Sequence, residues 1–213
     1  MEMRNQLSVL CTAALLTAPV CARAALTEVV IDFEGLASQV AGQDSVSIPD
    51  YSEDGFSFSS SVDPVLADTA FSVWGPANDN YSGSTALFST YDLAFTILTR
   101  TDGTPFSLLS IDLSPAFVDP GSPGSVLFRA RHSDSSVITQ EFEFGPGNAP
   151  VTRGFGTGFS DLVEVRWEQA APSHQFDNLR VAAVPEPAML TLLISGLLAL
   201  GAARRVTGAL GAA

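Results

Sequence analysis

Hydrophobic and polar residues alternate along much of the middle of the chain. In the segment 55–60 phenylalanine alternates with serine, and in the segments 138–144 and 162–168 apolar residues alternate with charged or polar ones. A period of two sends successive side chains to opposite faces of a β-strand, one face buried and the other in water. The pattern therefore predicts strands that each have a buried face and a solvent face.

Nine short runs of this kind are separated by segments rich in turn-forming residues. They cover 28–33, 55–60, 70–74, 93–99, 106–113, 126–131, 138–144, 162–168 and 176–182. Connections such as 119–124 and 145–150 consist largely of Pro, Gly, Asn, Asp and Ser, which favour turns. No run combines helical periodicity with capping residues. Residues 25–182 are thus predicted to form one all-β domain, an antiparallel β-sandwich of the jelly-roll type, with fourteen phenylalanines for its core.

The first 24 residues have the pattern of a secretory signal peptide. Arg4 precedes an apolar stretch, and Ala22 and Ala24 supply the small residues that signal peptidase requires. Two alternatives remain: a buried N-terminal helix, and a lipoprotein signal that ends at Cys21. Cleavage after Ala24 would remove both cysteines, so that the exported chain would contain no disulfide and no thiolate ligand.

The C-terminal residues 183–213 form a three-part tail: a Pro-Glu-Pro motif, an uncharged apolar run and an arginine pair. The parts are Pro185, Glu186 and Pro187, then residues 188–203, then Arg204 and Arg205. The prolines favour an extended strip. A helix of about 16 residues spans about 24 Å, slightly short of the usual transmembrane length, which suits a transient anchor in the inner membrane with the arginines on the cytoplasmic side. The alternative, an amphipathic core helix, conflicts with the hydrophobicity of all its faces.

This tail resembles the PEP-CTERM sorting signal of Gram-negative bacteria. The residues after the arginine pair, 206–213, depart from the pattern, because most members of the family end sooner. The resemblance implies processing by an exosortase, delivery to the cell surface or secretion, and an association with exopolysaccharide or biofilm matrix. The predicted organisation is a signal helix over 1–24, the β-sandwich over 25–182 and a sorting tail with a transmembrane helix over 183–213.

The charge of the chain narrows the classes of partner. The whole chain carries 23 acidic residues against 10 basic ones, all of them arginine, and its formal net charge is −13. Without the two sorting segments, 21 acidic residues face six arginines, and the formal charge becomes −15. Binding to a phosphate backbone needs clustered basic residues, so nucleic acid is excluded as a partner.

No catalytic motif stands out. His132 and His174 are isolated, and the sequence lacks a nucleophile elbow, a zinc-binding His-Glu-x-x-His pair and a Walker loop. Pairs of carboxylates for glycoside hydrolysis remain conceivable, but no particular pair is indicated. We therefore expect a protein that is not an enzyme.

The two ends of the predicted domain suggest a calcium site. The first and last strands of a jelly roll commonly lie side by side, which would bring Asp32 or Glu34 close to Asp177. Carboxylate oxygens are the ligands that calcium prefers. The arrangement resembles the structural calcium site of jelly-roll carbohydrate-binding modules, which implies Glu34 and Asp177 as ligands and Asp32 as a weaker candidate. The alternative is that these carboxylates are solvated charges at strand ends.

A carbohydrate-binding face would need exposed aromatic side chains. Trp74 and Tyr81 flank the loop 75–80, which is rich in Asn and Asp. Alternatively, Trp74 packs in the core at the end of a strand, as we expect for Trp167. The leading prediction is an exported, non-catalytic surface or matrix protein that binds extracellular polysaccharide. A structural matrix component without a ligand and an extracellular polysaccharide hydrolase are the alternatives.

Overall fold

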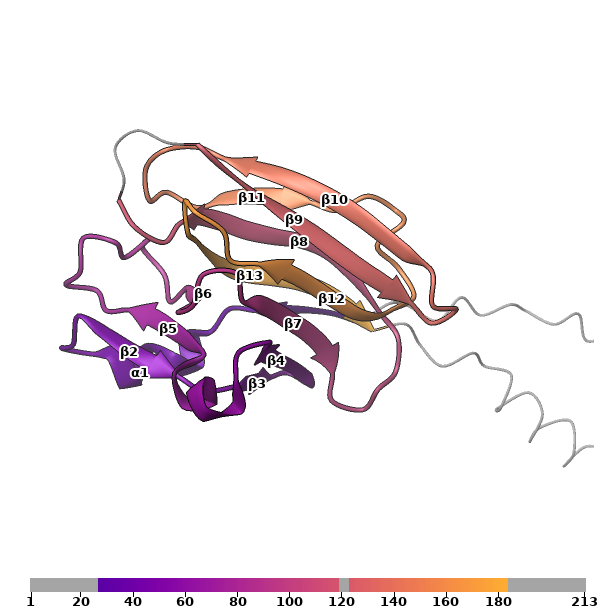
Figure 1. The fold of residues 1–213 in the computed structure, drawn as a ribbon, viewed down its shortest axis with the longest axis horizontal. Coiled ribbons are helices and arrows are strands. Elements are labelled where there is room, and N and C mark those ends of the chain that lie inside the picture. Colours follow the sequence, from indigo (N-terminus) through magenta and orange to yellow (C-terminus); the bar gives the residue numbers. More distant parts are fainter. Residues whose placement is uncertain (1–26, 119–122, 184–213) are drawn as a thin grey trace, which may run out of the picture.

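The computed structural model describes residues 27–118 and 123–183 (Figure 1). The predicted signal peptide and the sorting motif with its arginine pair lie outside the described residues. Within these two ranges, no helix has the length and apolar character needed to cross a membrane.

Strands make up most of the described chain. They are β1 (Thr27–Ile31), β2 (Ser45–Ile48), β3 (Tyr51–Glu53), β4 (Phe56–Ser60), β5 (Phe71–Trp74), β6 (Leu87–Ser89), β7 (Phe95–Arg100), β8 (Phe106–Pro115), β9 (Gly124–His132), β10 (Val137–Phe144), β11 (Val151–Gly154), β12 (Leu162–Glu168) and β13 (His174–Ala183). The helical elements described are short: η1 (Glu34–Leu36), α1 (Ala37–Val40) and η2 (Pro64–Thr69).

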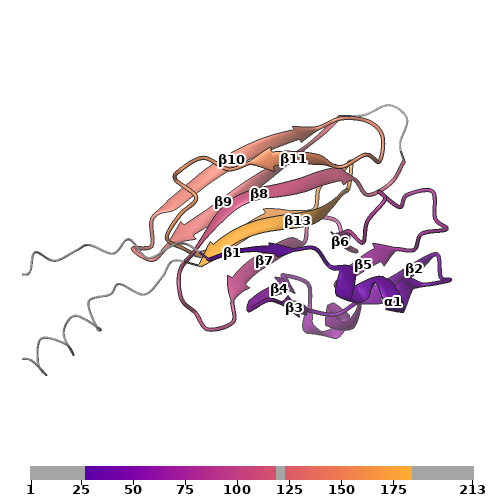
Figure 2. The same cartoon turned by 180° about the vertical axis from the view of Figure 1, so that it is seen from behind.

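The strands form two antiparallel layers, which confirms the predicted β-sandwich (Figures 1 and 2). The first layer has the order β2-β5-β6-β13-β8-β11, with β1 also paired to β13. The second layer has the order β3-β4-β7-β12-β9-β10. A backbone pair between Leu162 and Phe106 connects the two layers at one end.

Aromatic rings fill the space between the layers. Trp167 of the second layer is fully buried and packs edge-on against Phe176 of the first, with ring centroids 4.9 Å apart. Phe33 bridges in the same way between Phe58 and Phe176, at 5.2 and 5.8 Å. Burial of such large rings is the main favourable contribution to the stability of a fold of this kind. The core assignment of Trp167 is therefore confirmed.

The first and last strands lie side by side, as predicted. Residues Thr27–Ile31 of β1 pair with residues 179–183 of β13, and Ile31 lies opposite Leu179. Farther along the same edge of β13, Phe176 pairs with Leu87 of β6. This edge therefore changes partner at Asp177 and Asn178, and the change of partner creates the junction at which the candidate site lies.

Candidate functional site

Asp177 is buried at the point where the edge of β13 changes partner. Its neighbour Phe176 faces the core, so Asp177 faces the other side of the first layer, yet it is only 2% exposed. The loop 75–86 contributes to this burial, since the Ser84 hydroxyl donates a hydrogen bond to the Asp177 carboxylate. The backbone amide of Asn178, whose φ of 47° is left-handed, donates to the same carboxylate at 2.7 Å.

Glu34 reaches the same loop from the end of β1. Phe33 has a φ of 55°, and this left-handed residue turns the chain into η1. The Glu34 carboxylate then accepts hydrogen bonds from the amide and the hydroxyl of Thr85, at 2.9 and 3.2 Å. Because Ser84 and Thr85 are adjacent, the loop holds Glu34 and Asp177 near each other.

A third carboxylate, Asp112 of β8, lies directly opposite Asp177 in the sheet. The side-chain amide of Asn178 donates to Asp112 at 3.0 Å and to Asp177 at 3.2 Å, and the Thr152 hydroxyl donates to Asp112 at 2.5 Å. We call Glu34, Asp112 and Asp177 the carboxylate junction. The sequence pattern did not indicate Asp112.

The carboxylates of the junction lie close enough for their negative charges to disfavour one another. The pKa of Asp177 is raised to about 7, mainly by burial and also by the charges of Asp112 and Glu34, against the lowering effect of the hydrogen bonds from Ser84 and Asn178. The pKa of Tyr81 is also raised, first by burial and then by the charges of Glu34 and Asp177. A proton or a cation at the junction would relieve this repulsion.

The donor set at the junction fits a hard cation in part. Within 27–118 and 123–183, no three His, Cys, Asp or Glu side chains come together closely enough to hold one metal ion. Calcium also accepts hydroxyl and carbonyl oxygens, which Ser84 and Thr85 can offer beside the two carboxylates. Asp32 contributes differently, because its carboxylate accepts a bond from the Glu34 amide at 3.1 Å, and its charge acts on Glu53.

Trp74 belongs to a second feature, at the other end of the loop 75–86. Its ring stacks on Phe88 at 4.9 Å and meets the edge of Phe117 at 5.4 Å. Its indole Nε1–H donates to the Ala116 carbonyl at 2.7 Å, although the side chain is only partly buried. We call Trp74, Phe88 and Phe117 the aromatic platform. Tyr81, the other aromatic residue predicted for a sugar face, lies instead near the carboxylate junction, where the charges of Glu34 and Asp177 contribute to raising its pKa.

Phe117 is the unusual member of the platform. All fourteen phenylalanines lie in the described ranges, and Phe117 alone among them is exposed, at 49% of its surface. It lies two residues beyond the end of β8, and sequence patterning gives no signal for it, because such patterning assigns phenylalanine to the core. An aromatic ring left half in water beside a partly exposed tryptophan is a candidate contact surface.

The loop between the two features is fastened to the sandwich. The side-chain oxygen of Asn80 accepts a hydrogen bond from the Val118 amide at 2.7 Å, and the backbone carbonyl of Asn80 accepts one from the Gln175 side chain at 3.1 Å. Asn148 donates to the Tyr81 carbonyl at 3.1 Å. At the start of the loop, a Cβ on Gly75 would lie 1.8 Å from the Gln43 carbonyl oxygen, so only glycine fits there. The platform and the junction are thus connected by one segment that is hydrogen-bonded to the sandwich.

Among the hollows of the described surface, two have a single carboxylate each in their lining. One lies between β9 and β12 with Glu164, and the other lies beside Gly124 with Glu143. Glycoside hydrolysis needs two. His132 lies at the end of β9, whereas His174 is buried at the start of β13, so the two histidines belong to different layers.

Comparison with known proteins gives matches of fold only. No protein-family model and no curated protein matches the chain. A family 29 carbohydrate-binding module is 13% identical with a TM-score of 0.42, over 74% of this chain and 86% of that one. A variant of that module in complex with cellulohexaose is 13% identical with a TM-score of 0.41, over 74% and 91%. The F5/8 type C domain of a Bacteroides fragilis protein is 13% identical with a TM-score of 0.41, over 64% and 97%.

Proposed function

We propose that the chain is an exported, non-catalytic β-sandwich protein that binds carbohydrate through its aromatic platform. The observation that carries this proposal is the half-exposed Phe117, packed against the partly exposed Trp74. Flat aromatic faces suit the C–H faces of pyranose rings, because they remove apolar surface from water without demanding hydrogen bonds. The loop beside the platform supplies the exposed Asp79, whose carboxylate accepts no hydrogen bond from the described residues and can accept from sugar hydroxyls.

The rigidity of the platform supports a binding role. Trp74 is fixed by its bond to Ala116, and Val118, next to Phe117, is fixed by Asn80. A preformed surface loses little conformational entropy when a ligand binds, so even a small contact area can give measurable affinity.

A glycan screen followed by titration tests the proposal. The purified chain should bind at least one neutral polysaccharide, and Phe117→Ala should weaken that binding by about tenfold while leaving the melting temperature nearly unchanged, because half of the ring is already in water. Val65→Ala, which also truncates an exposed apolar residue, is the matched control and should bind normally. Absence of any bound glycan would leave the structural matrix component as the better reading, and release of new reducing ends would favour the hydrolase.

We further propose that the ends of the chain deliver this domain, through signal peptidase, transient anchoring in the inner membrane and an exosortase, to the cell surface or the matrix. The support is the order of motifs in the sequence: Pro185, Glu186 and Pro187 before an apolar run that ends at an arginine pair. Replacing Glu186 by Ala in the producing bacterium should retain the protein in the inner membrane. Unchanged delivery of that variant to the surface would argue against sorting by this tail.

We also propose that Glu34 and Asp177 hold a structural calcium ion, with oxygens of Ser84 and Thr85 beside them. The support is the crowding of carboxylates around a nearly buried Asp177. Calcium at about 100 times its Kd would stabilise the fold by about 3 kcal/mol. Asp32, which holds the Glu34 amide, stays a prediction as a ligand.

The variant Asp177→Asn separates calcium binding from general stability. In chelator it should be at least as stable as the wild type, because one of the repelling charges is gone, and calcium should no longer raise its melting temperature. Asp134→Asn, an exposed carboxylate on the turn between β9 and β10, should respond to calcium like the wild type. A wild-type melting temperature that is the same in calcium and in chelator would rule out the ion.

A further inference from the structure

Two arginines lie opposite each other on the outer surface of the second layer, and neither forms an ion pair with a described residue. In β9 the odd-numbered residues point outward, and in β12 Arg166 lies directly opposite Arg129 in the ladder. Like charges placed opposite each other on neighbouring strands destabilise a sheet. The pairing of Arg129 with Arg166 is therefore expected to lower the stability of the sheet.

The other arginines of the described residues are engaged. Arg131, Arg100 and Arg180 form ion pairs with Glu164, Asp102 and Glu28, and Arg153 donates to the Glu143 carbonyl. Among residues 27–118 and 123–183, neither Arg129 nor Arg166 has an ion pair or a hydrogen bond from its side chain. In a domain with 21 acidic residues, two arginines that lie opposite each other in the ladder and form no ion pair with a described carboxylate are unexpected.

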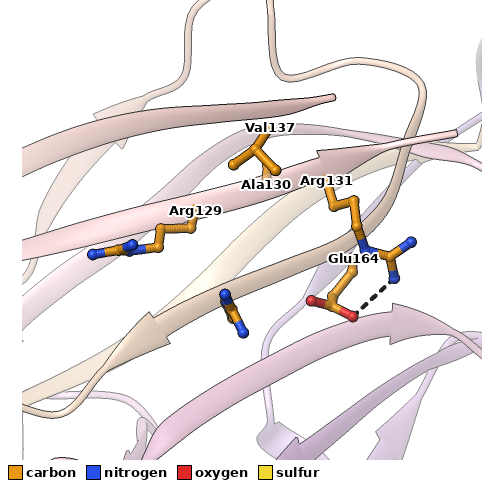
Figure 3. A pocket seen from close by; sticks show the side chains of 6 residues that line it. Arg129, Ala130, Arg131, Val137 and Glu164 are labelled. Carbon is orange, nitrogen blue, oxygen red and sulfur yellow. Dashed lines mark hydrogen bonds and ion pairs between the residues drawn. The ribbon is translucent and has the colours of Figure 1, made fainter. Parts of the chain in front are cut away.

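Arg129, Arg131 and Arg166 are among the residues that line a shallow hollow of about 240 Å³ (Figure 3). Arg129 and Arg131 project from the same strand, and Figure 3 shows Arg131 turned toward Glu164, with which it pairs at 3.0 Å. Arg166 is positioned by the ring of Phe95, which lies 5.4 Å from its guanidinium carbon. Three arginines and one glutamate give the hollow a formal charge of +2, within a domain of opposite sign.

From this arrangement we infer a second binding site, for the carboxylate groups of an acidic polysaccharide. Guanidinium groups bind carboxylates through paired, charge-assisted hydrogen bonds, and a carboxylate between Arg129 and Arg166 would also remove their mutual repulsion. The hollow has room for one acidic sugar unit, and it lies on an open strand face along which a polymer can continue. The choice of a polysaccharide as the carrier of the carboxylate rests on the proposed function, whereas the site itself is independent of the aromatic platform.

Titration with polygalacturonate, with neutral dextran as the comparison ligand, tests this inference. The purified chain should bind polygalacturonate with an affinity that falls as salt rises, and it should bind galacturonic acid monomer and inorganic sulfate much more weakly. The double variant Arg129→Gln, Arg166→Gln should lose at least tenfold in affinity. Its melting temperature should equal or exceed that of the wild type, because the repulsion is gone, so a failure to fold cannot explain the loss.

Arg180→Gln is the matched control, since it removes one arginine from an ion pair on the other layer. It should bind polygalacturonate within about twofold of the wild type. The inference is overturned if the wild type prefers dextran or binds both polymers equally, if Arg180→Gln loses as much affinity as the double variant, or if free sulfate binds as tightly as the polymer. Neutral-glycan binding that depends on Phe117 would survive any of these results, so the two proposals fail separately.

Discussion

Acidification should destabilise this fold through His174. The side chain is 1% exposed, and neither ring nitrogen has a hydrogen-bond partner among the described residues. Its ring lies beside Phe144, with centroids 6.1 Å apart, and the Gln169 side chain contacts only its backbone carbonyl. Burial lowers the pKa of His174 to about 3, and no charged group of the described residues contributes to that shift.

The sign of the effect follows from the direction of the shift. The unfolded chain takes up the His174 proton near pH 6.5, whereas the folded protein resists it down to about pH 3. Proton binding therefore favours the unfolded state, and the stability is fully present above about pH 6.5 and is lost as the pH falls toward 3. One pH unit corresponds to about 1.4 kcal/mol, so a change from about pH 7.5 to about pH 5 should lower the free energy of unfolding by about 2 kcal/mol. For a domain of about 150 residues, this is a decrease in melting temperature of about 4–8 °C.

His174→Leu isolates this contribution, because leucine has a similar volume and does not titrate. Urea unfolding at both pH values gives the loss of stability on acidification for the wild type and for the variant. Carboxylates with a raised pKa, such as Glu53, contribute equally to both losses, so their effect cancels in the difference between the two proteins. The variant should lose about 2 kcal/mol less than the wild type on acidification. His132→Gln, which replaces the partly exposed histidine, should behave like the wild type. Equal losses in the wild type and His174→Leu would refute the reasoning, since His174 would then already be hydrated or paired.

Two further predictions concern packing. In thermal unfolding, Gly75→Ala should lower the free energy of unfolding by at least about 2 kcal/mol, because the new Cβ would overlap the Gln43 backbone. Gly145→Ala is the control: no atom lies within 4 Å of its new Cβ, so the free energy of unfolding should change by less than about 0.5 kcal/mol. Trp167→Ala should lower it by about 3–5 kcal/mol in urea unfolding, because the fully buried ring lies between the two layers; a loss below about 1 kcal/mol would mean that the core re-forms around the gap.

The predicted strands illustrate what periodicity can reveal. Each of the nine runs corresponds to a strand, with ends that differ by at most two residues; for example, the run 126–131 lies within β9 (Gly124–His132). The strands that patterning missed are β2, β3, β6 and β11, each of three or four residues. Such lengths are too short for an alternation to repeat, and these strands exist because longer neighbours offer them an edge to pair with.

The candidate site was predictable only where it depends on chain order. The pairing of the first and last strands placed Glu34 near Asp177, and the hydrogen bonds to Ser84 and Thr85 agree with this expectation. Strict alternation would place Asp32 and Glu34 on one face, but the left-handed conformation of Phe33 breaks the alternation and gives the two carboxylates different roles.

Features that depend on the register between distant strands could not be predicted from the sequence. Asp112 joins the junction because β8 pairs with β13 in a register that places it opposite Asp177. Arg129 faces Arg166 only because an irregularity between Leu162 and Glu164 shifts the register of β12 against β9. The exposure of Phe117 depends in turn on where β8 ends. Local periodicity assigns a residue to a face, whereas these juxtapositions require the pairing of whole strands.

The loop 75–86 should couple the carboxylate junction to the aromatic platform. Asn80, in the middle of the loop, holds Val118 next to Phe117, and Thr85, near the end of the loop, binds Glu34. If a cation is removed from the junction, the carboxylates repel one another, and the loop that they anchor should loosen. Chelation should therefore weaken binding of a neutral glycan at the platform, although no platform residue is a ligand.

The arginine hollow provides the internal control for this coupling. It lies on the outer face of the second layer, between β9 and β12, and none of its lining residues contacts the loop 75–86 through a hydrogen bond or an ion pair of the described residues. Chelator should thus raise the Kd for a neutral glycan and leave the Kd for polygalacturonate unchanged at the same ionic strength. An equal loss at both sites would show that chelation unfolds the domain as a whole, and no loss at either would show that the platform is held without the ion. Only a selective loss is consistent with a loop that transmits the state of the junction to the platform.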